Sequence, residues 1–346
     1  MLESIWFILW GVLWAVYFML DGFDLGIGSL MPVLAKNEDD KRVMLNAIGP
    51  YWSGNEVWLI TAGGVTFAAF PLTYAVMFSG LYSALMLVLF ALILRGVAGE
   101  FRGKVDNPRW KTIWDACMVL GSFLPALLLG VAFANIFAGI PIDGEGVYQG
   151  TLFTLLNPYG LLGGVLFLVM FLLHGALWLA IKSEGELHQR TAALASRLWL
   201  ALLIVAVIFL GATWFATHLY DNYLRNPFFF VIPILLIPVA ALAALGMMKI
   251  YIEKKEWWKS WFASCVVIVG VTLFGVAGLY PNLLPSSINA TYNLTAFNSA
   301  SSPLTLKIML GVALTFIPVV IAYQVWVYHL FRDKVTLEDL AEEESY

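Results

Sequence analysis

The sequence is short of charge. Of its 346 residues only 12% are Asp, Glu, Lys or Arg, whereas 61% are hydrophobic; soluble domains carry about 25% charged residues. A chain of this length and composition is typical of a single polytopic membrane domain, here 1–346, and excludes two ordinary soluble domains. The only cysteines, Cys117 and Cys265, both fall in apolar stretches. We expect them to be packing residues and not a disulfide or thiolate site.

Residues and motifs that hold redox cofactors are also scarce. Of four histidines, only His174 lies deep inside an apolar stretch, whereas several haems would need a set of His, Met or Cys ligands. A lone histidine of this kind is more often a hydrogen-bonded core group than a ligand. The sequence contains no Cys-x-x-Cys-His, no Gly-x-Gly-x-x-Gly and no phosphate-binding loop. We therefore expect neither a metal site nor a catalytic residue on this chain.

Nine stretches are long and apolar enough to cross about 30 Å of hydrocarbon. They cover residues 5–33, 51–70, 73–97, 112–134, 158–181, 197–217, 228–248, 260–280 and 305–330. The first stretch lacks the basic flank and the cleavage site of a signal peptide, so we expect it to be retained as a helix. The sequence therefore predicts an all-α integral membrane protein with nine transmembrane helices.

Basic residues are almost absent from every second loop. Seventeen of the nineteen Lys and Arg lie within 36–42, 95–111, 182–197, 249–259 and 332–334, and the other two are Arg225 and Lys307. Cytoplasmic loops carry an excess of Lys and Arg. This pattern places the N-terminus outside and the C-terminus, with its acidic tail from Glu338 to Glu344, in the cytoplasm.

Two aspartates interrupt the first apolar stretch, in the run Leu20-Asp-Gly-Phe-Asp-Leu-Gly-Ile-Gly28. A carboxylate at the centre of a membrane helix costs about 2.5–3.5 kcal/mol on the insertion scale. The spacing of three residues places Asp21 and Asp24 on one helix face, which must face other helices or a water-filled cavity. The predicted orientation puts both in the inner half of the membrane.

Further polar residues are expected in the same inner layer. The predicted set comprises Asp21, Asp24, Ser53, Asn55, Glu56, Arg95, Glu100 and Asp115. Carboxylates that alternate with Asn and Ser can relay protons, which predicts a proton entry route from the cytoplasm. The alternative is a buried ion-pair network, in which Arg95 and Arg102 neutralise some of the carboxylates and hold the first four helices together.

Tryptophan is abundant, with fourteen residues that include Trp6, Trp10 and Trp14 in the first stretch. Such residues are expected mainly at the membrane interface and on lipid-facing surfaces. For Trp52, stacking against a quinone ring is the alternative role.

Several motifs together resemble subunit II of the cytochrome bd quinol oxidases. The longest are Asp21-Gly-Phe-Asp-Leu-Gly26 and Asn46-Ala-Ile-Gly-Pro-Tyr-Trp-Ser-Gly-Asn-Glu-Val-Trp-Leu-Ile-Thr-Ala-Gly-Gly64. Further matches are Arg95 with Glu100-Phe-Arg102, Trp114-Asp115, Gly121-Ser-Phe-Leu-Pro125, Leu156-Asn-Pro-Tyr-Gly160 and Lys182-Ser-Glu-Gly185. The resemblance covers the whole chain and is densest over residues 20–190.

The resemblance implies two four-helix bundles, at about 5–134 and 158–280, and one peripheral helix at 305–330. It implies a complex in the prokaryotic cytoplasmic (inner) membrane with a subunit I that holds haems b558, b595 and d, oxidises quinol and reduces oxygen to water. Subunit II would ligate no haem iron, would stabilise subunit I and would contribute to proton uptake. In some members it holds a structural quinone, and small single-helix accessory subunits join the complex.

The motif departs from the family pattern at one position. Many members carry an acidic residue after the motif tryptophan, where this sequence has Ser53. Serine can donate and accept hydrogen bonds but cannot hold a charge. Glu56, one turn later, is therefore expected to take over as the proton-holding group.

A proton-coupled secondary transporter is the alternative function that the composition allows. Such carriers often show inverted repeats and binding groups near the membrane midplane. The sequence shows no convincing repeat, and its carboxylates lie toward one face of the membrane. The oxidase-subunit hypothesis is therefore preferred.

Overall fold

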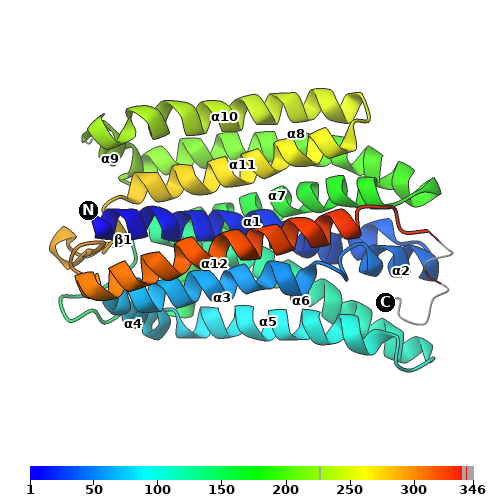
Figure 1. Ribbon diagram of the computed structural model, residues 1–346, viewed down its shortest axis with the longest axis horizontal. Helices are drawn as coiled ribbons and strands as arrows, with labels where there is room; N and C mark the ends of the chain where they lie inside the picture. The colour runs from blue at the N-terminus through cyan, green and yellow to red at the C-terminus, as the bar shows by residue number, and fades with distance from the viewer. Residues whose placement is uncertain (226, 337–339, 341–346) are drawn as a thin grey trace.

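The chain folds into a bundle of long helices that run side by side (Figure 1). The computed structural model describes residues 1–225, 227–336 and 340, with the side chains of 224–236 outside this description. The acidic tail that was used to orient the sequence falls almost entirely outside the described residues. Strand is limited to a short antiparallel pair, β1 (Asn282–Leu284) and β2 (Leu294–Thr295), in the described part of the chain. The expected all-α class is thereby confirmed.

Seven helices of the described chain are long and apolar enough to cross a membrane. They are α1 (Leu2–Leu34), α5 (Tyr82–Arg102), α6 (Pro108–Ala138), α7 (Pro158–Lys182), α8 (Gly185–Ala216), α11 (Trp257–Leu279) and α12 (Pro303–Leu330). Two more, α3 (Trp52–Ala69) and α10 (Pro227–Glu253), run alongside them (Figure 1). The shorter elements are α2 (Glu38–Asn46), α4 (Pro71–Gly80), η1 (Leu152–Leu156), α9 (Leu219–Arg225) and η2 (Ala290–Tyr292).

The stretch 73–97, expected as one helix, is divided at Leu81 into α4 and α5. The helical bonds continue on both sides, from the Leu81 amide to Met77 and from the Leu85 amide to Leu81, so the division is a local bend. Gly80 lies at the bend, and the side chain of Tyr148 fills the space where its Cβ would be. The uniform apolar composition hid this bend, because a loop from elsewhere in the chain determines it.

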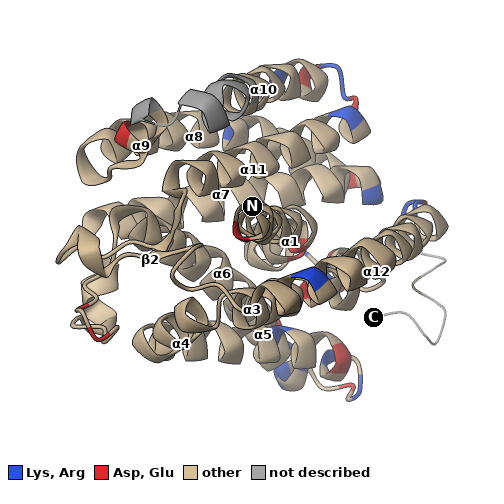
Figure 2. Ribbon diagram, turned by 60° about the vertical axis from the view of Figure 1, so that its left-hand side comes forward, with Lys and Arg blue, Asp and Glu red and all other residues tan. Residues whose placement is uncertain are grey.

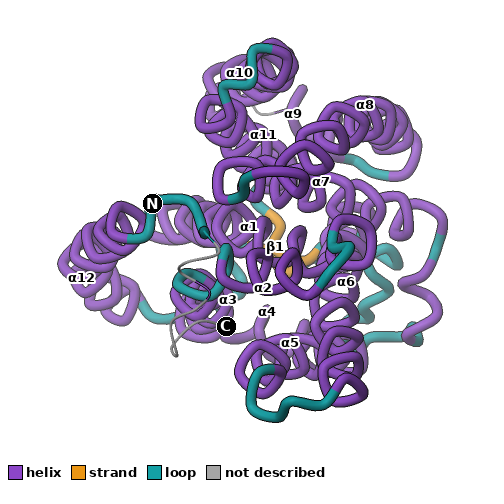
Figure 3. The backbone as a smooth tube through the Cα atoms, turned by 90° about the vertical axis from the view of Figure 1, so that its right-hand side faces the viewer, coloured by secondary structure: helices purple, strands orange, loops and turns teal. Residues whose placement is uncertain are grey.

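Helix α1 lies at the centre of the bundle and contacts α3, α6, α7 and α11 (Figure 3). Among the other helices, α6 packs between α5 and α7, α7 contacts α8 and α11, α10 packs on α11, and α3 continues into α4. Glycine makes the closest of these approaches possible. A Cβ on Gly26 would lie 2.0 Å from the carbonyl oxygen of Phe171, and one on Gly175 would lie 2.7 Å from the amide of Ile27. Helices α1 and α7 therefore meet backbone to backbone.

The tryptophans of α1 are not at a lipid interface, contrary to expectation. Trp6, Trp10 and Trp14 are all buried. The indole N–H of Trp10 donates to Thr66 on α3 (2.9 Å), and that of Trp6 donates to the carbonyl oxygen of Leu306 on α12 (3.0 Å). These rings are core groups because the central helix has neighbours on every side.

The loops rich in Lys and Arg lie together at one end of the bundle, called here the α2 end (Figure 2). Ion pairs and hydrogen bonds join these loops directly: Arg102 to Glu38, Arg190 to Asp40, and Lys334 to Glu184. The opposite end carries β1, β2 and the long loops on either side of them (Figure 1). The alternation of basic and non-basic loops in the sequence thus corresponds to the two ends of one bundle.

Helix α12 lies at the edge of the bundle and is largely exposed (Figure 3). Hydrogen bonds attach it near both of its ends. Trp6 binds the Leu306 carbonyl near its start, and beyond its last turn the Tyr51 hydroxyl donates to the Phe331 carbonyl oxygen (2.6 Å). Lys182 Nζ donates to the same carbonyl and to that of Asp333 (2.9 Å). Two polar residues in its last two turns, Gln324 and Tyr328, make the further contacts described below.

We predict that Gly26→Ala destabilises the protein by about 1–3 kcal/mol or more, because the added methyl group would overlap the backbone of α7. Gly211→Ala on α8 is the matched control, since its added Cβ would meet nothing within 4 Å. Thermal unfolding of the two purified variants in detergent compares them. An unchanged melting temperature for Gly26→Ala would show that the α1–α7 contact is not close.

Candidate functional site

The two aspartates of α1 are fully buried, and each meets a different helix. Asp21 Oδ1 lies 2.8 Å from Nη2 of Arg95 on α5, and the same guanidinium nitrogen lies 3.7 Å from Oε2 of Glu56 on α3. Arg95 is itself 2% exposed. One cation thus serves two carboxylates in an interior of low dielectric, where a charge without a partner is strongly destabilising.

Among the residues that the structure describes, Asp24 has an amide for its partner and no cation. Nδ2 of Asn55 on α3 donates to Asp24 Oδ2 at 2.8 Å. The carbonyl oxygen of the Asn55 side chain accepts two hydrogen bonds from α12, from Gln324 Nε2 (3.1 Å) and from the Tyr328 hydroxyl (3.0 Å). Trp58 Nε1 in turn donates to Gln324 Oε1 (2.8 Å). Asp21, Asp24, Asn55, Glu56 and Arg95 are called the Asp21 group below.

Several buried polar atoms around the Asp21 group make no hydrogen bond within the described part of the chain. They are Asp21 Oδ2, Asp24 Oδ1, Arg95 Nε, Arg95 Nη1 and the hydroxyl oxygen of Tyr17. Buried polar atoms of this kind are normally satisfied by ordered water. A cavity of about 20 Å³ lies against Asp24, Arg95 and Trp52, and that volume holds about one water molecule.

A second set of charges lies nearer the α2 end and is called the Asp115 group: Glu38, Lys41, Arg102, Lys111 and Asp115. Asp115 is 2.8 Å from Lys41 Nζ and 2.5 Å from Arg102 Nε, while Arg102 also binds both oxygens of Glu38 (2.8 and 2.9 Å). The hydrogen bonds from Arg102 hold the pKa of Glu38 below its usual value. Here three cations face two carboxylates, so every carboxylate has a cation and this group has the character of an ion-pair clamp between α2, α5 and α6.

The structure separates the remaining predicted residues from the Asp21 group. Ser53 and Glu100 both lie on exposed surfaces of their helices. Trp52 is half-buried, and its ring packs over Gly96, where an added Cβ would lie 3.3 Å from it. Sequence reasoning missed Gln324 and Tyr328. Their spacing of four residues in an otherwise apolar helix was the available signal, since it places both on one face.

The histidines make protein contacts that do not suit haem ligation. His174 Nε2 donates to the Met19 carbonyl oxygen (2.9 Å), Nδ1 lies 2.6 Å from the Ser264 hydroxyl, and the ring stacks on Trp261. Both ring nitrogens are therefore engaged, as expected for a core histidine. The described residues contain no group of three or more His, Cys, Asp or Glu side chains that could hold a metal ion.

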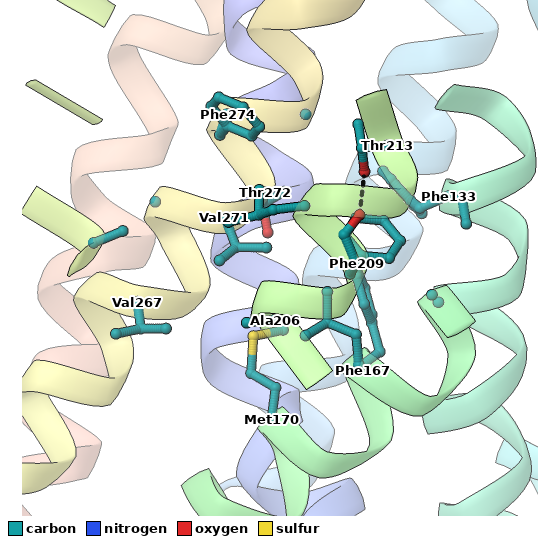
Figure 4. Close-up of a pocket in the computed structure, with 18 of the residues that line it drawn as sticks. Phe133, Phe167, Met170, Ala206, Phe209, Thr213, Val267, Val271, Thr272 and Phe274 are labelled. Atoms are coloured by element: carbon teal, nitrogen blue, oxygen red, sulfur yellow. Dashed lines mark hydrogen bonds between the residues drawn. The ribbon is translucent and has the colours of Figure 1, made fainter. Parts of the chain in front are cut away.

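An apolar cavity of about 120 Å³ lies between α6, α7, α8, α10 and α11 (Figure 4). Its lining includes Phe133, Phe167 and Phe209, and its few hydroxyl groups are already hydrogen bonded. Thr213 Oγ1 is 3.0 Å from the Tyr159 hydroxyl, and the hydroxyl of Thr272 donates to Ile268 (2.8 Å). The cavity is therefore suited to an apolar chain and not to a polar headgroup.

The fold and these two charge groups define a multi-pass membrane protein with a buried carboxylate–arginine site between its first helices. The family model described as cytochrome bd terminal oxidase subunit II matches residues 2–331. The chain belongs to this family.

Relatives with curated names agree. The chain is 36% identical over 335 residues to "Cytochrome bd ubiquinol oxidase subunit 2" of Bacillus subtilis (strain 168). The aligned region covers 97% of each chain. It is 36% identical over 369 residues to "Cytochrome bd-I ubiquinol oxidase subunit 2" of Escherichia coli (strain K12), covering 98% of this chain and 96% of the relative. A chain of the bd oxidase structure from Geobacillus thermodenitrificans superposes with a TM-score of 0.74 at 14% identity, over 96% of this chain and 99% of that one. At this low identity, the structural similarity shows that the two chains share a fold.

We predict that Arg95→Leu costs about 3–5 kcal/mol of stability, because it leaves the Asp21 carboxylate buried without a cation. The double variant Arg95→Leu/Asp21→Asn should recover most of that loss, since replacing both partners of a buried pair is often neutral. A double-mutant cycle measured by thermal unfolding tests this, with the exposed Arg109→Gln as control. Equal losses in the single and double variants would contradict a direct pair.

The lowered pKa of Glu38 predicts a loss of stability in acid. The Glu38–Arg102 bridge stabilises the fold fully above the ordinary glutamate value of 4.5 and is lost as the pH falls through the lower value of the folded state. Thermal melts across this range should therefore show a fall that Glu38→Gln lacks. An identical acid profile in wild type and Glu38→Gln would exclude a contribution from this bridge.

Proposed function

We propose that this chain is the haem-free subunit II of a bd-type quinol oxidase, the complex that couples quinol oxidation to the reduction of oxygen to water. Family membership carries the proposal. The proposed complex lies in the prokaryotic cytoplasmic membrane, with the α2 end inside and nine spans that comprise α3 and α10 as well as the seven apolar helices. Family membership also favours this function over a proton-coupled carrier.

The haems b558, b595 and d belong to the partner subunit I in this proposal. The chemistry of the histidines supports the assignment, because the one deeply buried imidazole uses both nitrogens on protein groups. His188 Nδ1 donates to the Ala180 carbonyl oxygen, His218 lies beside Asp221, and His329 lies beside Arg332. What this chain supplies to the complex is packing surface and proton-bearing groups.

The exposed apolar faces of α3, α5 and α12 offer a surface on which subunit I can pack. Ile60 on α3 is 71% exposed and Leu314 on α12 is 70% exposed. Such surfaces are covered by lipid or by other helices in a membrane. We assign the side of the bundle formed by these three helices to subunit I, and remaining exposed surfaces to lipid and to small single-helix accessory subunits.

We assign proton uptake from the cytoplasm to the Asp21 group. Two features support this role over a purely structural one. Carboxyl groups outnumber cations, with Asp21, Asp24 and Glu56 around the single guanidinium of Arg95, so Asp24 can exchange a proton without loss of the Asp21–Arg95 ion pair. The polar atoms that lack protein partners and the adjoining water-sized cavity supply the hydrogen-bonded route that proton transfer requires.

The isoprenoid tail of a structural quinone fits the apolar cavity better than the space beside Trp52. The space beside Trp52 is about 20 Å³, whereas the cavity of Figure 4 is about 120 Å³ and is lined by apolar side chains. The isoprenoid tail of a quinone matches that lining. The role of Trp52 in this proposal is to close the space over Gly96.

We predict that Asp24→Asn in the assembled complex lowers oxygen consumption by at least about tenfold, the range that removal of a proton-transfer group typically produces. The haem spectrum should stay unchanged, because the chain ligates no haem in this proposal. Stopped-flow proton uptake and steady-state oxygen consumption measure the effect after assembly is verified.

Asp106→Asn is the matched control, because the Asp106 side chain is 99% exposed and belongs to neither charge group. It should keep normal turnover. Full turnover and full proton uptake in Asp24→Asn would overturn the proton-path assignment, while loss of haem absorption from a complex with an intact partner would overturn the assignment of haem to subunit I.

A further inference from the structure

The hydrogen bonds from Trp58 through Gln324 and Asn55 to Asp24 form one donor-to-acceptor chain, and the indole of Trp58 fixes its direction. The N–H of Trp58 can only donate, so the atom of Gln324 that faces it must be the carbonyl oxygen Oε1. The amide nitrogen of Gln324 then points away from Trp58 and toward Asn55. The orientation of this side-chain amide is therefore set by chemistry and not by a free choice between two equivalent rotamers.

The orientation of the Asn55 side-chain amide follows by the same argument. Gln324 Nε2 and the Tyr328 hydroxyl both approach the same atom of Asn55, at 3.1 and 3.0 Å. Since an amide nitrogen can only donate, that atom is the acceptor Oδ1. Nδ2 of Asn55 must then face Asp24, to which it donates at 2.8 Å. Asn55 is fully buried, so no solvent competes for either side of its amide.

The orientation matters because each side of the Asn55 amide favours a different form of Asp24. The N–H group can donate only to an acceptor and stabilises the carboxylate, whereas Oδ1 would accept the proton of a neutral carboxylic acid. We infer that α12, through Gln324 and Tyr328, holds the Asn55 amide in the orientation that favours release of the proton from Asp24. Gln324 and Tyr328 are thus positioning residues for Asp24, and this inference rests on the proposed role of Asp24 in proton uptake.

Helix α12 is suited to such control because it makes few contacts with the rest of the bundle along most of its length. Most of its apolar side chains are exposed, and its described hydrogen bonds to α1 and to the α2 end lie near its two ends. The contact of Gln324 and Tyr328 with Trp58 and Asn55 is its polar link to α3. A displacement of α12 by a partner subunit would break both hydrogen bonds to Asn55 together. The Asn55 amide would then be free to rotate.

Other titratable and charged groups also act on Asp24. Asp21 on α1, Arg95 on α5, with its second partner Glu56, and Tyr51 before α3 are unchanged by the variants below, whereas the hydroxyl of Tyr328 on α12 is itself removed in one of them. The test must therefore report on Asp24 directly and must separate an effect through Asn55 from a general electrostatic change.

The experiment follows the infrared carbonyl band of protonated Asp24 in the intact complex as the pH is varied, with Asp24→Asn to identify the band. Tyr328→Phe removes one hydroxyl and Gln324→Leu removes the amide donor. In each, the band should persist to higher pH, by about one pH unit, the scale of losing a hydrogen bond that orients a donor to a charged group. Tyr323→Phe, on an exposed position of the same helix, should leave the band unchanged.

An Asn55→Ala background separates the mechanisms. If Tyr328 acts through the amide, adding Tyr328→Phe to Asn55→Ala produces no further shift. An equal shift with and without Asn55, or no shift in Tyr328→Phe and Gln324→Leu, overturns the inference. Should Gln324→Leu fail to assemble, Tyr328→Phe decides alone, because it changes one atom. These results are independent of turnover: normal turnover in Asp24→Asn would refute the proton-path proposal, whereas the band titration tests the control by α12.

Discussion

A carboxylate that is removed from water must find a cation or a hydrogen-bond donor, and the first helices of this protein are arranged around that requirement. Asp21 takes the cation Arg95 from α5, and Asp24 takes the amide donor of Asn55 from α3. The three helices have to pack closely enough for both contacts to form. A buried pair of this kind contributes little net stability compared with apolar packing, but it penalises any arrangement that leaves one partner alone. It therefore specifies the packing of α1 against α3 and α5.

The two charge groups differ in what surrounds them, and this difference separates their proposed roles. In the Asp115 group, cations outnumber carboxylates by three to two, and the side chains of Glu38 and Lys41 are 43% and 33% exposed. Water and salt screen such pairs, so the group acts mainly as a clamp at the α2 end. In the Asp21 group, carboxyl groups outnumber cations and water is largely excluded. An excess of buried carboxyl groups is what permits a proton to be held and released, and this supports the assignment of proton uptake there.

Much of the fold followed from composition and periodicity, because the membrane leaves the backbone few options. The long apolar stretches became helices, and the basic loops gathered at one end of the bundle. The bend at Leu81 and the burial of Trp6, Trp10 and Trp14 were not predictable in this way. Both depend on which segments pack beside them: Tyr148 against Gly80 in the first case, and helices on every side of α1 in the second.

Several members of the candidate site were predictable, but their connections were not. The sequence by itself determined that the chain is a membrane protein, that Asp21 and Asp24 must face other helices or a water-filled cavity, and which family the motifs resemble. Only the tertiary structure decided that Ser53 and Glu100 face outward, and that Gln324 reaches Asn55 across 269 residues of sequence. The reason is physical: helix periodicity fixes which residues share a face, but the direction of an amide depends on the donors that another helix brings to it.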